Sequence, residues 1–142
     1  MANLPDVETG REASIRWGWL KAMYIYTLVG AGSFGVVALF FPGVARTLFR
    51  FPAGDPAVLG LYGSFSLAAG LLAIPALRAP LKFVPLLFLQ LVYKPIWLFV
   101  VAVPLFLKGQ FPLYIVILSA VYLTYIVGNL VAIPFPYLFS RK

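Results

Sequence analysis

Cysteine and histidine are both absent from the 142 residues. Their absence excludes disulfides, thiolate nucleophiles and the metal, iron–sulfur or haem sites that these side chains build. Acidic residues are also scarce: there are four (Asp6, Glu8, Glu12 and Asp55), and none lies inside a long apolar run. Carboxylate-driven ion coupling and triad catalysis therefore lack their usual residues. We expect no catalytic residue, no metal and no cofactor.

The chain is instead rich in apolar residues, with 63% hydrophobic, 17% aromatic and 11% charged positions. Such a composition excludes an ordinary soluble domain and indicates a polytopic α-helical membrane protein. The net charge of +7 does not indicate nucleic-acid binding, because the basic residues cluster at the ends of apolar runs. We therefore expect the lipid bilayer as a partner and no nucleic acid.

Four apolar runs are long enough to span a bilayer, each with about 22 to 25 residues. They cover Leu20–Phe41, Pro56–Leu77, Phe83–Leu107 and Phe111–Ile133. Because the loops between them are short, residues 1–142 are predicted to form a single integral membrane domain. The expected fold is an all-α, up-down bundle of four transmembrane helices.

The first loop is the longest, and it predicts a further short helix between the first two spans. Pro42 ends the first span, and residues 43–51 alternate apolar side chains with Arg46 and Arg50, a pattern typical of a helix lying in the membrane interface. Asp55-Pro56 then predicts a helix cap followed by proline at the first helical position. An ion pair between Asp55 and either arginine is compatible with that cap.

The distribution of lysine and arginine predicts the orientation. Seven of these residues fall on the side of the two termini and three on the other side: Arg11, Arg16, Lys21, Arg78, Lys82, Arg141 and Lys142 against Arg46, Arg50 and Lys108. The positive-inside rule then predicts a multi-pass protein of the inner (plasma) membrane with both termini in the cytoplasm. We expect lipid headgroup contacts at Arg46, Arg50, Arg78 and Lys82.

Lys94 carries the one charge inside the third apolar run. At the helical rise it lies about 18 Å from Lys82 and about 21 Å from Lys108, so it is near the middle of a hydrocarbon core about 30 Å thick. A lysine at that depth costs at least about 2.5–3.5 kcal/mol if it faces lipid. Lys94 is therefore predicted to face protein, water or a ligand.

Other polar side chains follow Lys94 at helical spacing. Gln90, Tyr93 and Trp97 share its face of the third span, and the fourth span offers a matching stripe. The candidate ligand- or partner-binding residues are thus Lys94, Tyr93, Gln90, Trp97, Tyr122, Tyr125 and Asn129. The alternative is a structural lysine satisfied by tyrosine hydroxyls, Gln90 and a backbone carbonyl. Pro95 removes the hydrogen bond to the Leu91 carbonyl and predicts a kink at Lys94-Pro95.

Small and hydroxyl side chains form stripes on the first two spans. The stripes are Tyr24, Thr27, Ala31 and Gly35 on the first span, and Tyr62, Ser66 and Gly70 on the second. Small residues at such spacing let membrane helices approach closely, so we interpret both stripes mainly as packing faces.

The stretch from Phe41 to Ile74, FPGVARTLFRFPAGDPAVLGLYGSFSLAAGLLAI, resembles small four-helix bacterial membrane proteins of the DoxX-like type. The shared features are a proline-ended first span, a short basic interfacial segment and a glycine-rich second span, over about a quarter of the chain. The resemblance implies a four-helix membrane fold. It also implies a role as a membrane subunit that accompanies redox enzymes.

Two functional hypotheses follow. The first is a non-catalytic integral membrane accessory subunit, or a small binding protein, of a larger membrane assembly, with other membrane subunits or further copies of the chain as partners. The alternative is a small oligomeric carrier or channel for an anionic or polar substrate, using Lys94 with Tyr93, Gln90 and Asn129. An enzyme acting on lipid has no specific residue set in its favour.

Overall fold

The computed structural model describes residues 15–50 and 54–139, and every regular element in these ranges is helical. Four segments are long and apolar enough to cross a membrane: α2 (Trp17–Phe40), α4 (Pro56–Arg78), a composite third span (Pro80–Leu107) and α7 (Leu113–Ala132). The predicted all-α membrane fold with four spans is confirmed. Its third span begins at Pro80 instead of Phe83, because Pro80 opens an additional helical turn.

The third span is built from four consecutive pieces: η1 (Pro80–Phe83), α5 (Val84–Trp97), η2 (Leu98–Ala102) and α6 (Val103–Leu107). The α-helical backbone continues through Pro95, and the departure from α geometry comes one turn later in η2, a π-helical turn. There the Val103 N–H bonds to the Leu98 carbonyl, five residues back. The irregularity thus lies between Pro95 and Pro104, each of which removes one regular helical hydrogen bond.

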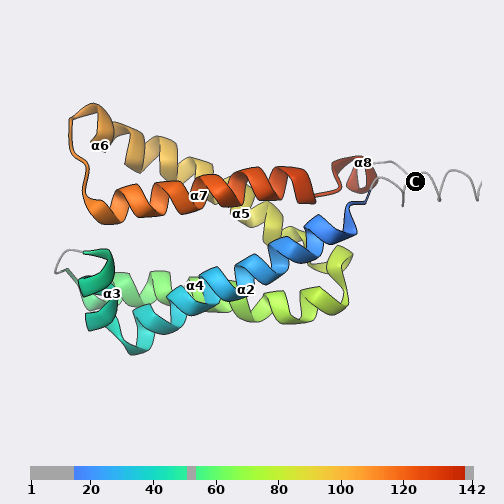
Figure 1. Cartoon of the computed structure of the whole chain (residues 1–142), viewed down its shortest axis with the longest axis horizontal. Helices are drawn as coiled ribbons and strands as arrows, with labels where there is room; N and C mark the ends of the chain where they lie inside the picture. The colour runs from blue at the N-terminus through green and yellow to red at the C-terminus, as the bar shows by residue number, and fades with distance from the viewer. Residues whose placement is uncertain (1–14, 51–53, 140–142) are drawn as a thin grey trace, which may run out of the picture.

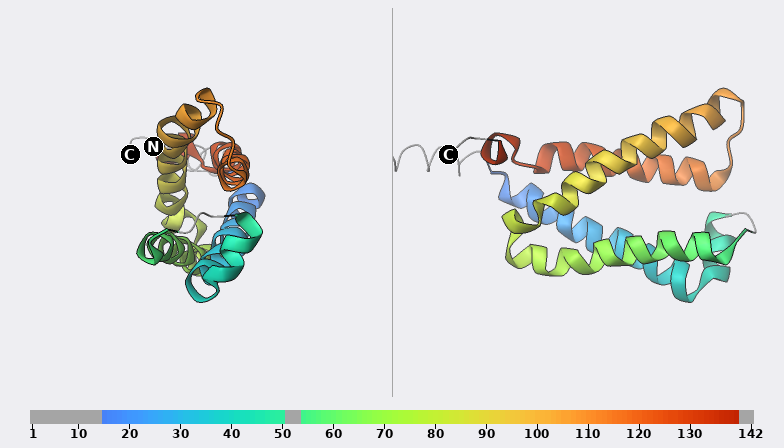
Figure 2. Two further views of the ribbon diagram at one scale, coloured as in Figure 1. Left: turned by 90° about the vertical axis from the view of Figure 1, so that its left-hand side faces the viewer. Right: turned by 180° about the vertical axis from the view of Figure 1, so that it is seen from behind.

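The four spans form two antiparallel hairpins, α2 with α4 and the third span with α7 (Figure 1). The start of α2, the η1 turn and α8 (Phe135–Leu138) lie at one end of the molecule, which we call the α8 end. The opposite end holds α3 (Pro42–Phe49) and α6, and we call it the α3 end. The hairpins diverge toward the α3 end, and the end-on view of Figure 2 shows the four spans arranged as a ring.

Close backbone contact joins α2 to α4. A Cβ added at Gly70 would lie 2.6 Å from the Cα of Gly32, and one added at Gly63 would lie 2.9 Å from the Cβ of Ala38. A Cβ at Gly35 would overlap the backbone of Leu67. Two residues of the predicted stripes, Gly35 and Gly70, lie in this seam, and the other small residues in it are Gly32, Ala38 and Gly63.

The short helix α3 occupies the predicted position between the first two spans. It covers Pro42–Phe49, and its C-cap is Arg50, whose φ of 55° lies in the left-handed region. Phe51, the last residue of the predicted segment, is outside the described residues. The Asp55 side chain accepts a hydrogen bond of 2.9 Å from the Ala57 N–H, with Pro56 at the first helical position. The predicted cap is confirmed, and it orients α4 beside α3.

Bulky buried side chains fill the bundle at the α8 end. Leu20, Tyr24 and Leu87 have no exposed surface, and Val84 has almost none. The Tyr24 hydroxyl donates a 2.6 Å hydrogen bond to the Pro80 carbonyl, which ties α2 to the η1 turn. Apolar side chains such as Leu61 and Leu107 are instead highly exposed on the outer surface, as expected for helices that face lipid.

Candidate functional site

Lys94 lies between the two hairpins and is 3% exposed. Among residues 15–50 and 54–139 the acidic side chain is Asp55, and it sits at the start of α4 as a helix cap. No carboxylate of the described spans can therefore balance the Lys94 charge. The prediction that Lys94 turns away from lipid is confirmed by its burial.

Three tyrosine rings surround the Lys94 ammonium. Its Nζ lies 4.4 Å from the ring centroid of Tyr93, 4.7 Å from that of Tyr122 and 4.3 Å from that of Tyr125. Aromatic faces attract cations through their quadrupoles, each by about 0.5–1 kcal/mol at exposed sites and about 2 kcal/mol or more when desolvated. We call this group the tyrosine cage, and it takes the place of a counter-ion.

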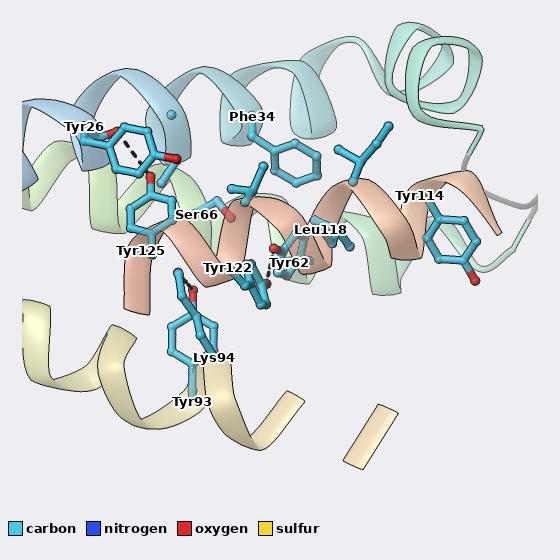
Figure 3. A pocket seen from close by; sticks show the side chains of 14 residues that line it. Tyr26, Phe34, Tyr62, Ser66, Tyr93, Lys94, Tyr114, Leu118, Tyr122 and Tyr125 are labelled. Atoms are coloured by element: carbon cyan, nitrogen blue, oxygen red, sulfur yellow. Dashed lines mark hydrogen bonds between the residues drawn. The ribbon is translucent and has the colours of Figure 1, made fainter. Parts of the chain in front are cut away.

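The hydroxyl groups of Tyr93, Tyr122 and Tyr62 lie near Lys94 (Figure 3). The ammonium donates a 2.7 Å hydrogen bond to the Tyr93 hydroxyl. The Tyr122 hydroxyl hydrogen-bonds to that of Tyr62 on α4, and the Tyr122 ring packs edge-on against Tyr93, with ring centroids 6.0 Å apart. Hydroxyl groups that can each donate or accept a proton thereby join α7 to α4 beside the cage.

Gln90 and Asn129 belong to a separate polar cluster closer to the α8 end. The Asn129 amide donates to Gln90 Oε1 at 3.4 Å, and the Gln90 amide donates to Thr27 Oγ1 at 3.3 Å. Thr27 in turn donates to the Met23 carbonyl at 2.8 Å. The cluster therefore links α7, α5 and α2 across the bundle, and all three polar side chains are almost fully buried.

A cavity of about 230 Å³ lies beside the tyrosine cage and receives side chains from all four spans (Figure 3). Its polar lining consists of Lys94, Ser66 and the hydroxyls of several tyrosines, and the remaining wall is apolar. The residues that bound this inner cavity on α2 and α4 are Tyr26, Gly30, Ala31, Phe34, Tyr62 and Ser66.

A second cavity of about 450 Å³ lies nearer the α3 end. It shares Tyr62, Tyr114, Leu118 and Tyr122 with the inner cavity, so the two adjoin. Trp97 lines this outer cavity and packs edge-on against Tyr122, with ring centroids 5.1 Å apart. Its mouth is formed by three residues beside α3, namely Arg46, Gly54 and Asp55.

The predicted site residues therefore divide into three groups. Lys94, Tyr93, Tyr122 and Tyr125 come together in the cage, Trp97 lies one turn further along α5 in the outer cavity, and Gln90 and Asn129 form the amide cluster. The structural alternative expected Gln90 to bind Lys94. The amide of Gln90 instead bonds to Asn129 and Thr27, because its helical turn faces a different set of neighbours.

Three residues that the sequence assigned to packing faces contribute polar groups here. Thr27 completes the amide cluster, Tyr62 hydrogen-bonds to Tyr122, and Ser66 lines the inner cavity. Their hydroxyl chemistry was visible in the sequence, but the direction in which each side chain points depends on helix rotation. Tyr26, a further cavity residue, had no distinguishing sequence signal.

The four basic residues expected at headgroup level lie at the two ends of the bundle. Arg46 is half-buried at the α3 end, where its Nη2 donates to the Gly54 carbonyl at 3.5 Å, and Arg50 is exposed beside it. Arg78 and Lys82 are exposed at the α8 end. These positions suit headgroup contacts, which stay a prediction.

The arrangement offers binding chemistry more readily than bond-making chemistry. A desolvated cation attracts anions and carbonyl oxygens, and tyrosine hydroxyls next to it can supply further hydrogen bonds. Comparison with known proteins adds no relative from which a role could be transferred: no protein-family model, curated protein or solved structure matches this chain.

Proposed function

We propose that this chain is a small, non-catalytic membrane protein that binds a ligand through an anionic or carbonyl oxygen placed against Lys94. The observation behind the proposal is a buried ammonium that has three tyrosine rings and, among the described residues, no carboxylate around it, at the wall of a cavity that all four spans line. Its one hydrogen bond within the described residues goes to Tyr93, which leaves two donors for a ligand.

The role we favour is that of an accessory or binding subunit in a larger membrane assembly, composed of other membrane subunits or of further copies of the chain. Support comes from the small size of the bundle and from its apolar outer surface, which suits lipid or neighbouring helices. The resemblance to DoxX-like proteins points the same way, toward a subunit that accompanies a redox enzyme.

We propose the inner (plasma) membrane as the location, with both termini in the cytoplasm. The fold supports this by grouping the basic residues: Arg16, Lys21, Arg78 and Lys82 lie toward the α8 end, whereas Arg46, Arg50 and Lys108 lie toward the α3 end. The α8 end would then face the cytoplasm.

Native mass spectrometry on protein extracted in a mild detergent tests the binding function. We expect the wild-type chain to retain a small molecule that Lys94→Met loses, while Lys108→Met, which removes an exposed lysine, retains it. Lys94→Met should still fold with equal or higher thermal stability, because a buried charge is often replaceable by an apolar side chain. Equal occupancy in wild type and Lys94→Met would leave Lys94 a structural residue.

The two adjoining cavities favour one second candidate, a small oligomeric carrier or channel for an anionic or polar substrate. Co-purification from native membranes separates the candidates. A stoichiometric partner supports the subunit, whereas a homo-oligomer that moves anions in proteoliposomes supports the carrier.

A further inference from the structure

Two adjoining cavities lie on the α3 side of Lys94, whereas packed side chains lie on its α8 side. From the α3 end, the outer cavity begins at Arg46 and Asp55 and adjoins the inner cavity at Tyr62, Leu118 and Tyr122. Lys94 lies on the wall of that inner cavity. A ligand that arrives from the α3 end therefore meets Arg46 first and Lys94 last.

The opposite direction is blocked by packed side chains. One helical turn from Lys94 toward the α8 end, Gln90 is 1% exposed and is held by Asn129 and Thr27. Beyond it, the fully buried Leu87 and Tyr24 fill the space between α5 and α2. The hydrogen bond from Tyr24 to Pro80 closes the bundle at this level.

The charge and polarity of the residues that line the two cavities indicate which class of ligand fits. Arg46 and the oppositely charged Asp55 both line the outer cavity, whereas Lys94 is the charged residue that lines the inner cavity, so an anion is favoured beside Lys94. The outer cavity is lined by apolar and aromatic side chains, including Val58, Leu59 and Trp97, and it meets the inner cavity at the hydrogen-bonded pair Tyr62 and Tyr122. A strongly hydrated anion such as phosphate would lose its water there without enough donors to replace it.

From these observations we propose that the site accepts a compact lipophilic organic monoanion, such as an aromatic or short-chain carboxylate, that reaches Lys94 only from the α3 end. The carboxylate bonds to the free Lys94 donors, and its apolar body lies among the aromatic side chains. The proposal rests on the ligand-binding function above and adds a ligand class and a direction of access.

The cysteine-free sequence allows a direct test with single cysteines. Ser66→Cys reports on the inner cavity, and Ala73→Cys lies two helical turns further along the same face of α4, at the buried α8 end. Lys108→Cys and Lys82→Cys mark the two membrane faces. Intact cells and inverted membrane vesicles are treated with membrane-impermeant methanethiosulfonates, one anionic (sulfonatoethyl) and one cationic (trimethylammonioethyl).

We expect Ser66→Cys to react only from the face on which Lys108→Cys reacts, and Ala73→Cys to react from neither. The anionic reagent should modify Ser66→Cys about tenfold faster than the cationic one, a ratio within the range of electrostatic steering. Adding Lys94→Met should remove that preference. Benzoate should protect Ser66→Cys from modification, and inorganic phosphate at the same concentration should not.

Each part of the proposal can fail on its own. Modification of Ser66→Cys from both faces, or only from the Lys82→Cys face, overturns the direction of access. Faster modification of Ser66→Cys by the cationic reagent overturns the role of Lys94 in selection, and so does an anionic preference that persists in the Lys94→Met background. Equal protection by phosphate and benzoate overturns the lipophilic ligand class. If mass spectrometry still shows a Lys94-dependent small molecule, these failures leave the binding function standing. Thermal unfolding of each cysteine variant confirms that it is folded.

Discussion

At the scale of single residues, the stabilisation of Lys94 divides between ring faces and one hydroxyl group. The faces come from Tyr93, Tyr122 and Tyr125, and the hydroxyl bond comes from Tyr93. Ring faces act through their quadrupoles and need no ionised oxygen. The cage therefore holds a cation in the bilayer while leaving the neighbouring cavity without a competing carboxylate.

Substitutions at Tyr125 should isolate the ring-face contribution, because its hydroxyl donates to the Tyr26 carbonyl at 3.2 Å and not to Lys94. Tyr125→Phe keeps the ring over the ammonium, so we expect a loss of less than about 1 kcal/mol, as for removal of one hydrogen bond. Tyr125→Leu removes the ring face and should destabilise the protein by about 1–2 kcal/mol more than the phenylalanine variant. Thermal or denaturant unfolding in detergent measures the difference. The same two variants are then measured in a Lys94→Met background. If the difference in unfolding free energy between Tyr125→Phe and Tyr125→Leu stays the same, the ring does not act through the lysine.

The amide cluster gives a second prediction at this scale. Gln90→Leu leaves the buried Asn129 amide without its acceptor and should cost about 1–3 kcal/mol. The double variant Gln90→Leu with Asn129→Leu removes both groups and should recover part of that loss. A double-mutant cycle on unfolding free energies measures the coupling. Strict additivity would show that the 3.4 Å contact contributes nothing.

The sequence was sufficient to find Lys94 and its tyrosines, because one charge in a span is conspicuous and helical spacing places neighbours on one face. It was not sufficient to separate Gln90 from Lys94, although both lie on that face. Which partner each meets is decided by the rotation and height of α2 and α7 beside them. Tyr62 was assigned to a packing face for the same reason, since a hydroxyl in a small-residue stripe is compatible with either packing or a site.

At the scale of elements, the α2–α4 seam determines how the first hairpin is held together. Gly32 and Gly70 bring the two backbones into contact, and Gly35 meets the Leu67 backbone. The lengths of apolar runs were enough to predict both helices, but the register between them was not. Register depends on which small residues oppose each other, and several glycines in each span could have served.

Gly70→Val should destabilise the hairpin, because the added Cβ would lie 2.6 Å from the Gly32 Cα. We expect a loss of about 1–3 kcal/mol from overpacking. Gly60→Ala is the matched control on the same helix, since a Cβ there meets nothing within 4 Å. It should be neutral or slightly stabilising, because alanine favours the helix. Similar melting temperatures for Gly70→Val and wild type would argue against a tight seam.

At the scale of the whole molecule, the bundle separates its basic residues toward two ends, and this separation predicts the topology. Arg78→Cys at the α8 end should be labelled by impermeant thiol reagents in inverted vesicles and not in intact cells, whereas Lys108→Cys should show the reverse. Four spans in the described residues place the start of α2 and the end of α7 on one side in either orientation. Labelling of Arg78→Cys in intact cells would reverse the assignment and place the cavity mouth in the cytoplasm.

The order in which the chain is synthesised gives the tyrosine cage a consequence for biogenesis. Two of its three rings, Tyr122 and Tyr125, belong to α7, the last of the four spans to leave the ribosome. Until α7 is inserted, Tyr93 is the one ring of the cage that can contact the Lys94 ammonium. In an unfinished copy the charge at membrane depth therefore lacks two of its three aromatic contacts, which raises the free energy of the partly inserted chain. Insertion of α7 supplies the rings of Tyr122 and Tyr125 and completes the cage.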